Sequence, residues 1–264
     1  MAGATSNKTK SEPEPIDRLR TLLKARGADG DFDASTGYLD LIDGRKEPVN
    51  PATIAMQLPL VSAIYERYWR PGFTRIAKGI NGPGLSAEYE QAHQLLRIKR
   101  GDVVLDLACG PGNFSRRFAR AIAPDGLVVG YDGSKSMLDR AVREALLDET
   151  PSLAFAHGEA TALPFKAGSF DSVCCFAALH MFPEPFETLS EVARVLKPGG
   201  RVALMTSSVS GDGVSALAAR ALGTASGMKM FTETQIRDEL EQRGFTIETQ
   251  ESAGVTQLVG AILN

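Results

Sequence analysis

The sequence is poor in cysteine, in net charge and in long hydrophobic runs. Its 264 residues include three cysteines, and the formal net charge is −3 at pH 7. No apolar stretch approaches the roughly 20 residues of a membrane-spanning helix, and the N-terminus has no apolar block like that of a secretory signal. The weak net charge gives no broad attraction to a phosphate backbone. These features favour a cytoplasmic protein without a membrane span, and they disfavour nucleic acid as a partner.

The three cysteines do not have the spacing of metal ligands. Cys174 and Cys175 are adjacent in a predicted strand and therefore face opposite sides of it, so we interpret them as buried thiols. Cys109 lies apart from them in the sequence. Unpaired thiols are typical of a reducing compartment. We expect no metal site.

The length is that of one α/β domain with a small N-terminal addition. Residues 1–15 have the small, polar composition of a disordered tail. Residues 16–84 are predicted to form an N-terminal extension and a helical lid, with a small strand or hairpin near residues 38–42. Residues 85–264 are predicted to form the main domain.

From residue 101 onward, strand-like and helix-like segments alternate. Short apolar runs predict strands at 103–107, 127–131, 154–157, 172–176 and 201–206, with a terminal pair at 245–250 and 255–263. Helical patterns fall between them at 114–122, 135–147, 186–196 and 232–243. This alternation is typical of a Rossmann-like, three-layer α/β sandwich. We predict a seven-stranded, mostly parallel sheet with an antiparallel last strand and an N-terminal helical cap.

Polar residues lie at the ends of the first four predicted strands. Asp106 is in the first strand, Asp132 follows the second, Glu159 the third and His180 the fourth. In an open parallel sheet, ligands bind beyond the carboxyl ends of the strands, where the strand order reverses. An acid placed like Asp132 can accept both hydroxyls of a ribose, and Glu159 can accept the amine of a base. The pattern therefore predicts a site for an adenosine.

The turn after the first strand distinguishes between adenosine ligands. Gly110 and Gly112 let the backbone approach a ligand at the start of a helix, but Ser115 replaces the third glycine of a dinucleotide-binding turn. Asp106 precedes the turn, where a carboxylate would repel a pyrophosphate. S-adenosylmethionine suits the turn better, because it has a cationic amino-acid end and no phosphate. An NAD-dependent oxidoreductase is the competing interpretation.

Five segments in order resemble the motifs of class I S-adenosylmethionine-dependent methyltransferases, in the branch of the ubiquinone and menaquinone C-methyltransferases (type 11). They are residues 104–112, 131–138, 158–165, 169–173 and 196–201. The resemblance covers about residues 95–206. Two positions depart from the pattern, since Ala108 replaces a usual glycine and Glu159 a commoner aspartate. The resemblance implies an enzyme that transfers a methyl group and leaves S-adenosylhomocysteine.

The resemblance also implies how the cofactor is held. Asp106 and the glycines of the turn would hold the methionine part, and Asp132 the ribose. Met137 and Glu159 would contact the adenine, and the backbone after the fourth strand would lie near the sulfonium. The expected cofactor-binding residues are Asp106, Ala108, Gly110, Gly112, Asp132, Gly133, Met137, Glu159, Ala160, Phe176 and Ala177.

Methyl transfer to carbon, oxygen or nitrogen also needs a proton acceptor in many cases. His180 is the candidate catalytic base because it follows the fourth strand, and the alternative is a structural residue in the wall of the crevice. His93 and His157 are expected to be structural. A non-catalytic S-adenosylmethionine-binding scaffold of the same fold is the alternative to an enzyme.

The acceptor is expected to lie between the crevice and two covering segments, residues 51–78 and 207–231. Tyr65, Tyr68, Trp69 and Met228 are the candidate acceptor-binding residues in these segments. They predict a small hydrophobic or aromatic acceptor. Each of them can equally be a core residue.

Overall fold

The computed structural model describes residues 14–25, 31–42, 84–209 and 228–264. The described strands are β1 Asp31–Asp33, β2 Tyr38–Asp40, β3 Val103–Leu107, β4 Leu127–Asp132, β5 Leu153–His157, β6 Phe170–Phe176, β7 Leu196–Ser207, β8 Phe245–Ala253 and β9 Thr256–Leu263. The described helices are α1 Glu14–Leu22, α5 Leu85–Leu96, α6 Asn113–Ile122, α7 Lys135–Leu147, the 3₁₀ helix η2 Leu179–Met181, α8 Pro185–Val195 and α10 Glu233–Glu241.

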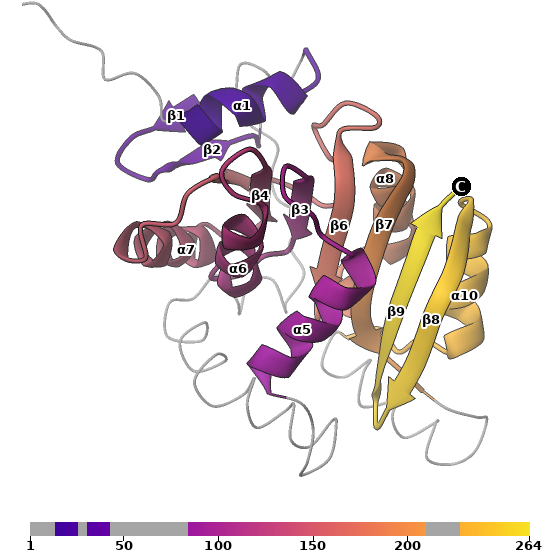
Figure 1. Cartoon of the computed structure of the whole chain (residues 1–264). Helices are drawn as coiled ribbons and strands as arrows, with labels where there is room; N and C mark the ends of the chain where they lie inside the picture. Colours follow the sequence, from indigo (N-terminus) through magenta and orange to yellow (C-terminus); the bar gives the residue numbers. More distant parts are fainter. Residues whose placement is uncertain (1–13, 26–30, 43–83, 210–227) are drawn as a thin grey trace, which may run out of the picture.

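The described strands form one sheet in the order β1-β2-β5-β4-β3-β6-β7-β9-β8 (Figure 1). From β2 to β7 every neighbouring pair is parallel, and β9 is antiparallel to both β7 and β8. The antiparallel last strand is therefore confirmed. The strand order reverses between β3 and β6, which is where an open parallel sheet has its binding crevice.

Helices cover both faces of the sheet. On one face, Phe118 and Ile122 of α6 pack with residues of α5. On the same face, Leu138 of α7 packs with Phe155 of β5. On the other face, α1, α8 and α10 pack on side chains such as Leu105. In Figure 1, α5 crosses in front of the sheet, and α8 and α10 lie behind it. The three-layer α/β fold is confirmed.

The described sheet has nine strands, so the prediction of seven was too low. The hairpin of β1 and β2 joins the edge of the sheet, since Leu39 lies opposite Ala156 and Asp40 opposite His157 in a parallel pairing with β5. Leu39 is fully buried in the main core. A strand of three residues is too short for its alternation to reveal which sheet it joins. Its carboxyl end reaches the same edge as the ends of β3 to β6.

The predicted division into a tail, an extension with a lid and a main domain from residue 85 stays a prediction. Residues 1–13 and most of the expected lid, 43–83, lie outside the described residues. The described helix α1 buries Ile16 and Leu19 in the same hydrophobic core as the central strands. No helix in the described ranges is long and apolar enough to cross a membrane.

Packing between β4 and β5 leaves no room for a side chain at Gly130. A Cβ at this position would lie 2.5 Å from a ring carbon of Phe155, and that ring is buried. We expect Gly130→Ala to lower the free energy of unfolding by about 1–3 kcal/mol through overpacking, measured from the urea midpoint. In a Phe155→Leu background the same change should cost less. An unchanged midpoint for Gly130→Ala would contradict this packing.

Candidate functional site

The turn after β3 has a left-handed backbone at three positions. Ala108, Gly110 and Gly112 have φ of 56°, 55° and 71°. Left-handed backbone strains any residue with a Cβ by about 1 kcal/mol or more, so Ala108 carries strain that glycine would not. At Gly112, the N-cap of α6, a Cβ would also lie 3.1 Å from the Phe155 ring. The turn brings backbone N–H groups and the start of α6 to the reversal point of the sheet.

Asp106 lies beneath this turn. Its side chain points to the α6 face, is 3% exposed, and accepts a hydrogen bond of 2.5 Å from Ser115 Oγ. Ser115 occupies the place where a dinucleotide-binding turn has its third glycine, and sequence reasoning missed its role as the partner of Asp106. The structure therefore holds a buried carboxyl group directly before the glycine turn.

Asp132 connects two loops at the carboxyl edge. Its Oδ2 accepts from the N–H of Gly110 at 2.8 Å, and its Oδ1 accepts from the N–H of Ser134 at 2.8 Å. Burial raises the pKa of Asp132 above its ordinary value, although the two N–H groups and His157 favour the carboxylate. Each oxygen of a carboxylate can accept more than one hydrogen bond. Asp132 can therefore hold the turn and still accept from a ligand.

Glu159 and Ala160 follow β5 and are half-buried. Tyr131 supports this loop from the other core face, because its hydroxyl donates to the carbonyl of Glu159 at 3.3 Å. The N–H of Gly158 donates to the carbonyl of Asp132 at 3.1 Å, which ties the ends of β4 and β5 together. The structure thus brings Asp132, Glu159 and Ala160 to one edge, as predicted from their positions after the strands.

Two further predicted residues frame the same edge. Gly133 follows β4 directly, and its carbonyl faces a ring nitrogen of His157 at 3.1 Å. Met137 is buried in the first turn of α7. The placement of both residues beside Asp132 agrees with the expected adenosine end of the site, and their contact with a cofactor stays a prediction.

The end of β6 supplies the other side of the crevice. The ring of Phe176 lies 5.3 Å from that of Phe114 at the start of α6. Ala177 has φ of 59°, and its N–H donates to the carbonyl of Met205 at 2.8 Å. Strained backbone of this kind clusters at functional sites. Ala108 and Ala177 therefore mark the ends of the two strands that flank the reversal point.

His180 lies in η2, just beyond β6. It is 7% exposed, and its Nδ1 has no hydrogen-bond partner among the described residues. Burial lowers the pKa of His180 to about 4, so the imidazole is neutral near pH 7. The hydroxyl of Thr206, near the end of β7, is also buried without a partner in the described part of the chain. These two atoms offer unused hydrogen-bonding capacity beside the crevice.

The end of the second covering segment contacts this region. The N–H of Lys229 donates to the carbonyl of His180 at 2.8 Å, and the Ser207 hydroxyl donates to the carbonyl of Lys229 at 2.6 Å. Met228, next to them, is half-buried. The other candidate acceptor-binding residues, Tyr65, Tyr68 and Trp69, lie outside the described residues.

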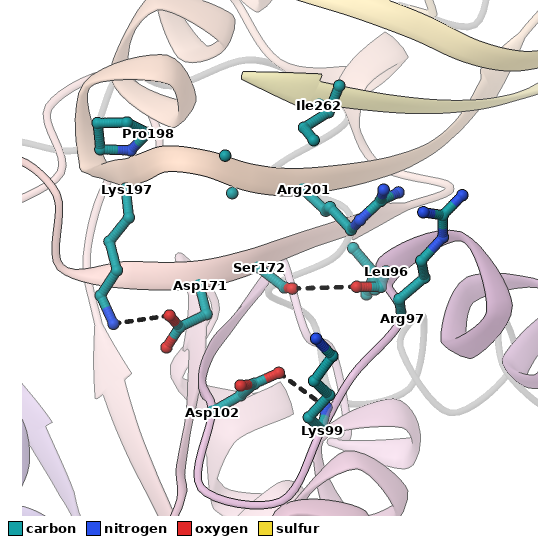
Figure 2. A pocket seen from close by; sticks show the side chains of 12 residues that line it. Leu96, Arg97, Lys99, Asp102, Asp171, Ser172, Lys197, Pro198, Arg201 and Ile262 are labelled. Atoms are coloured by element: carbon teal, nitrogen blue, oxygen red, sulfur yellow. Dashed lines mark hydrogen bonds and ion pairs between the residues drawn. The ribbon is translucent and has the colours of Figure 1, made fainter. Parts of the chain in front are cut away.

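A cavity of about 360 Å³ lies at the opposite edge of the sheet, at the amino ends of β3, β6 and β7 (Figure 2). Two lining residues form an ion pair, with Lys197 Nζ 2.7 Å from Asp171 Oδ1. A third, Arg201, pairs with Glu248 outside the lining at 2.5 Å. These pairs join β6 to β7 and β7 to β8. Since the cavity faces away from the carboxyl edge, we interpret it as structural and not as the cofactor site.

The cysteines of the protein are single, buried thiols. Cys109, Cys174 and Cys175 are free and buried, and burial raises the pKa of each thiol. In the ranges that the structure covers, no group of three or more histidine, cysteine or acidic side chains could hold a metal ion.

Comparisons with known proteins point to one family. Residues 104–200 match the family described as "Methyltransferase domain". An uncharacterized chloroplastic methyltransferase of Arabidopsis thaliana is 34% identical over 69% of this chain and 53% of its own. The demethylmenaquinone methyltransferase of Lactococcus lactis is 32% identical over 47% of this chain and 56% of its own. The chain therefore spans about half the length of these curated relatives.

A solved structure supports the same fold. The geranyl diphosphate C-methyltransferase of Streptomyces coelicolor, solved with S-adenosylhomocysteine, aligns with a TM-score of 0.59 and 16% identity, over 68% of this chain and 76% of its own. Residues 104–200, the segment that matches the methyltransferase family, contain the glycine turn, Asp132, Glu159 and His180. Together with the parallel sheet and its strand-end residues, these matches show that residues 104–200 are a methyltransferase domain with the fold of the class I S-adenosylmethionine-dependent methyltransferases.

Proposed function

We propose that this protein transfers the methyl group of S-adenosylmethionine to a small hydrophobic or aromatic acceptor. The observation that carries the proposal is the position of Asp132, which joins the glycine turn to the loop after β4. A carboxylate at that point can accept the hydroxyls of a ribose. The donor's adenosine would then lie across the ends of β3, β4 and β5.

The residues present fit this cofactor better than a dinucleotide. The buried Asp106 lies directly before the turn and is bound to Ser115, so a pyrophosphate placed on the turn would approach a carboxylate. The methionine part of S-adenosylmethionine has an ammonium group, for which that acid is favourable. The glycine turn offers backbone N–H groups at the start of α6, which suit the carboxylate of the same methionine part.

The reaction needs little covalent chemistry from the protein. When bound, S-adenosylmethionine supplies an electrophilic methyl group on a positively charged sulfur. Asp106, the turn and Asp132 would fix the cofactor's orientation, and alignment of the reacting groups lowers the barrier. His180, kept neutral by burial, would take the proton that the acceptor loses. The imidazole would then carry a positive charge as the sulfur loses its own.

Several side chains near the end of β6 support an apolar acceptor. Met181, Phe182 and Phe186 are partly buried beside the core, and the ring of Phe186 lies 5.8 Å from that of Phe231. The half-buried Met228 lies shortly before Phe231 on the returning segment. One relative is named a demethylmenaquinone methyltransferase, and a quinone-type acceptor would suit this lining. His180 and Thr206 would bind the polar group of such an acceptor.

Charge and cysteine content bear on the kind of acceptor and on the cellular compartment of the protein. A net charge of −3 favours a small molecule over nucleic acid as the acceptor. The three free, buried cysteines suit a reducing compartment, and we propose the cytoplasm.

Removal of the Asp132 carboxylate tests the ribose assignment. We expect Asp132→Ala to weaken binding of S-adenosylhomocysteine about 10- to 100-fold, because hydrogen bonds to a charged acceptor are lost. Isothermal titration calorimetry measures the effect. Asp125→Ala removes an acid that is exposed and distant from the site and should bind like the wild type. Equal affinity of Asp132→Ala and the wild type would remove Asp132 from the site.

Ligand-dependent melting separates the methyl donor from a dinucleotide. At 100 times its dissociation constant, a ligand that binds only the folded state stabilises it by about 2.7 kcal/mol. We expect S-adenosylhomocysteine to raise the melting temperature and NAD to leave it unchanged. The opposite result would favour an NAD-dependent oxidoreductase.

Substitution of His180 tests proton transfer. We expect His180→Ala to lower turnover about 10²- to 10⁴-fold with little change in affinity for S-adenosylhomocysteine, because the histidine would act on the acceptor. The assay uses isotopically labelled donor with a panel of phenols, quinols and cell extract, and mass spectrometry detects products heavier by one methyl. Unchanged turnover would make His180 a wall residue. Absence of any product from a wild type that binds cofactor would favour the non-catalytic scaffold.

A further inference from the structure

His157, at the end of β5, lies between two hydrogen-bond acceptors. Its side chain is 1% exposed. Nδ1 lies 2.9 Å from a carboxylate oxygen of Asp40, and Nε2 lies 3.1 Å from the carbonyl oxygen of Gly133. Both oxygens are acceptors, so the imidazole ring is the donor toward them. The geometry makes His157 a hydrogen-bonded link from β2 to the loop after β4.

Asp40 is itself held in place as a carboxylate. Its second oxygen pairs with Lys135 Nζ at 2.7 Å, and the N–H of Ile42 donates to the first at 3.2 Å. Burial alone raises the pKa of Asp40, but hydrogen bonds from Lys135 and His157 outweigh it and hold the pKa below the ordinary value. The ring of Tyr38 packs edge-on to His157, with 6.4 Å between ring centroids. Charge and packing therefore fix both members of the pair.

The contacts continue without a break from β2 to the glycine turn. Asp40 binds His157, and His157 binds the carbonyl of Gly133. Gly133 is the neighbour of Asp132, whose carboxylate accepts from Gly110. The backbone strengthens the same connection, because the N–H of Leu41 donates to the carbonyl of His157 at 2.9 Å. Asp40 lies outside residues 104–200, the segment that matches the methyltransferase domain.

We propose that Asp40 is a positioning residue for cofactor binding, which acts through His157 to fix the loop that carries Asp132. This inference rests on the proposed function, because it takes Asp132 to be the residue that binds the ribose. It makes the hairpin of β1 and β2 part of the cofactor site, although no atom of Asp40 needs to touch the ligand. Because coupling of two sites is reciprocal, cofactor binding also stabilises the docking of β2.

A double-mutant cycle tests this route. Calorimetry with S-adenosylhomocysteine is carried out on the wild type, Asp40→Asn, Asp132→Ala and the double variant. We expect Asp40→Asn to weaken binding about tenfold in the wild-type background and less than about twofold when Asp132 is already absent, because coupled residues are non-additive. Asp33→Asn is the matched control. It changes an exposed acid of the same hairpin that bonds to Ser35 and not to His157, and it should bind like the wild type.

The outcomes separate this inference from the proposed function. No binding by folded wild type overturns the proposed function and this inference with it. Binding by the wild type with unchanged affinity in Asp40→Asn overturns this inference alone. An equal loss in both backgrounds also overturns it, because a general structural defect would be additive.

One measurement on the wild type keeps the test independent of how the variants fold. Hydrogen exchange should show slower exchange at the N–H of Leu41, which donates to the carbonyl of His157, when S-adenosylhomocysteine is added, as the reciprocal coupling requires. Exchange at Leu41 that does not respond to the ligand would contradict the proposal.

Discussion

The Asp132 carboxylate is the interaction on which the rest of the site depends. It accepts from the N–H groups of Gly110 and Ser134, and so it joins the turn after β3 to the loop after β4 at the carboxyl edge of the sheet, where it is half-buried. Removing a carboxylate from water is costly unless hydrogen bonds satisfy it, and here the backbone supplies them. The turn cannot move away from β4 without losing the hydrogen bond from the N–H of Gly110 to this carboxylate. The same constraint that closes the crevice leaves acceptor capacity on both oxygens for a ribose.

Strained backbone and specific hydrogen bonds surround the Asp132 carboxylate. Ala108 and Ala177 have left-handed backbone at the ends of β3 and β6, the two strands between which the strand order reverses. Asp106 is fixed by Ser115 beneath the turn, and the proposed function uses its carboxylate to disfavour phosphate there. On the far side, the contacts of Lys229 with His180 and Ser207 bring the returning chain against the place proposed for the acceptor. The proposed function assigns the carboxylate of Asp106 to a nucleoside with a cationic tail and the contacts of Lys229 to its acceptor.

Much of this was predictable from local sequence, and the rest was not. The apolar runs of β3 and β4 and the position of Asp132 after β4 define the sheet and its edge, because buried parallel strands have a simple pattern. The pairing of Asp40 with His157 joins residues 117 positions apart, and β2 is too short for its pattern to indicate a partner. From the sequence, His157 is expected to be structural because its place beside Glu159 suits a catalytic base less well than that of His180. The bond of Ser115 to Asp106 depends on how α6 is rotated on the sheet, which its helical pattern gives only coarsely.

The central claim is that Asp132 receives the ribose of the methyl donor. The most direct measurement compares S-adenosylhomocysteine with its 2′,3′-dideoxy analogue in calorimetric titrations of the wild-type protein. The account predicts that the analogue binds about tenfold more weakly or worse, because the lost hydroxyls leave the carboxylate without its ligand donors. Equal affinities for the two ligands would contradict it.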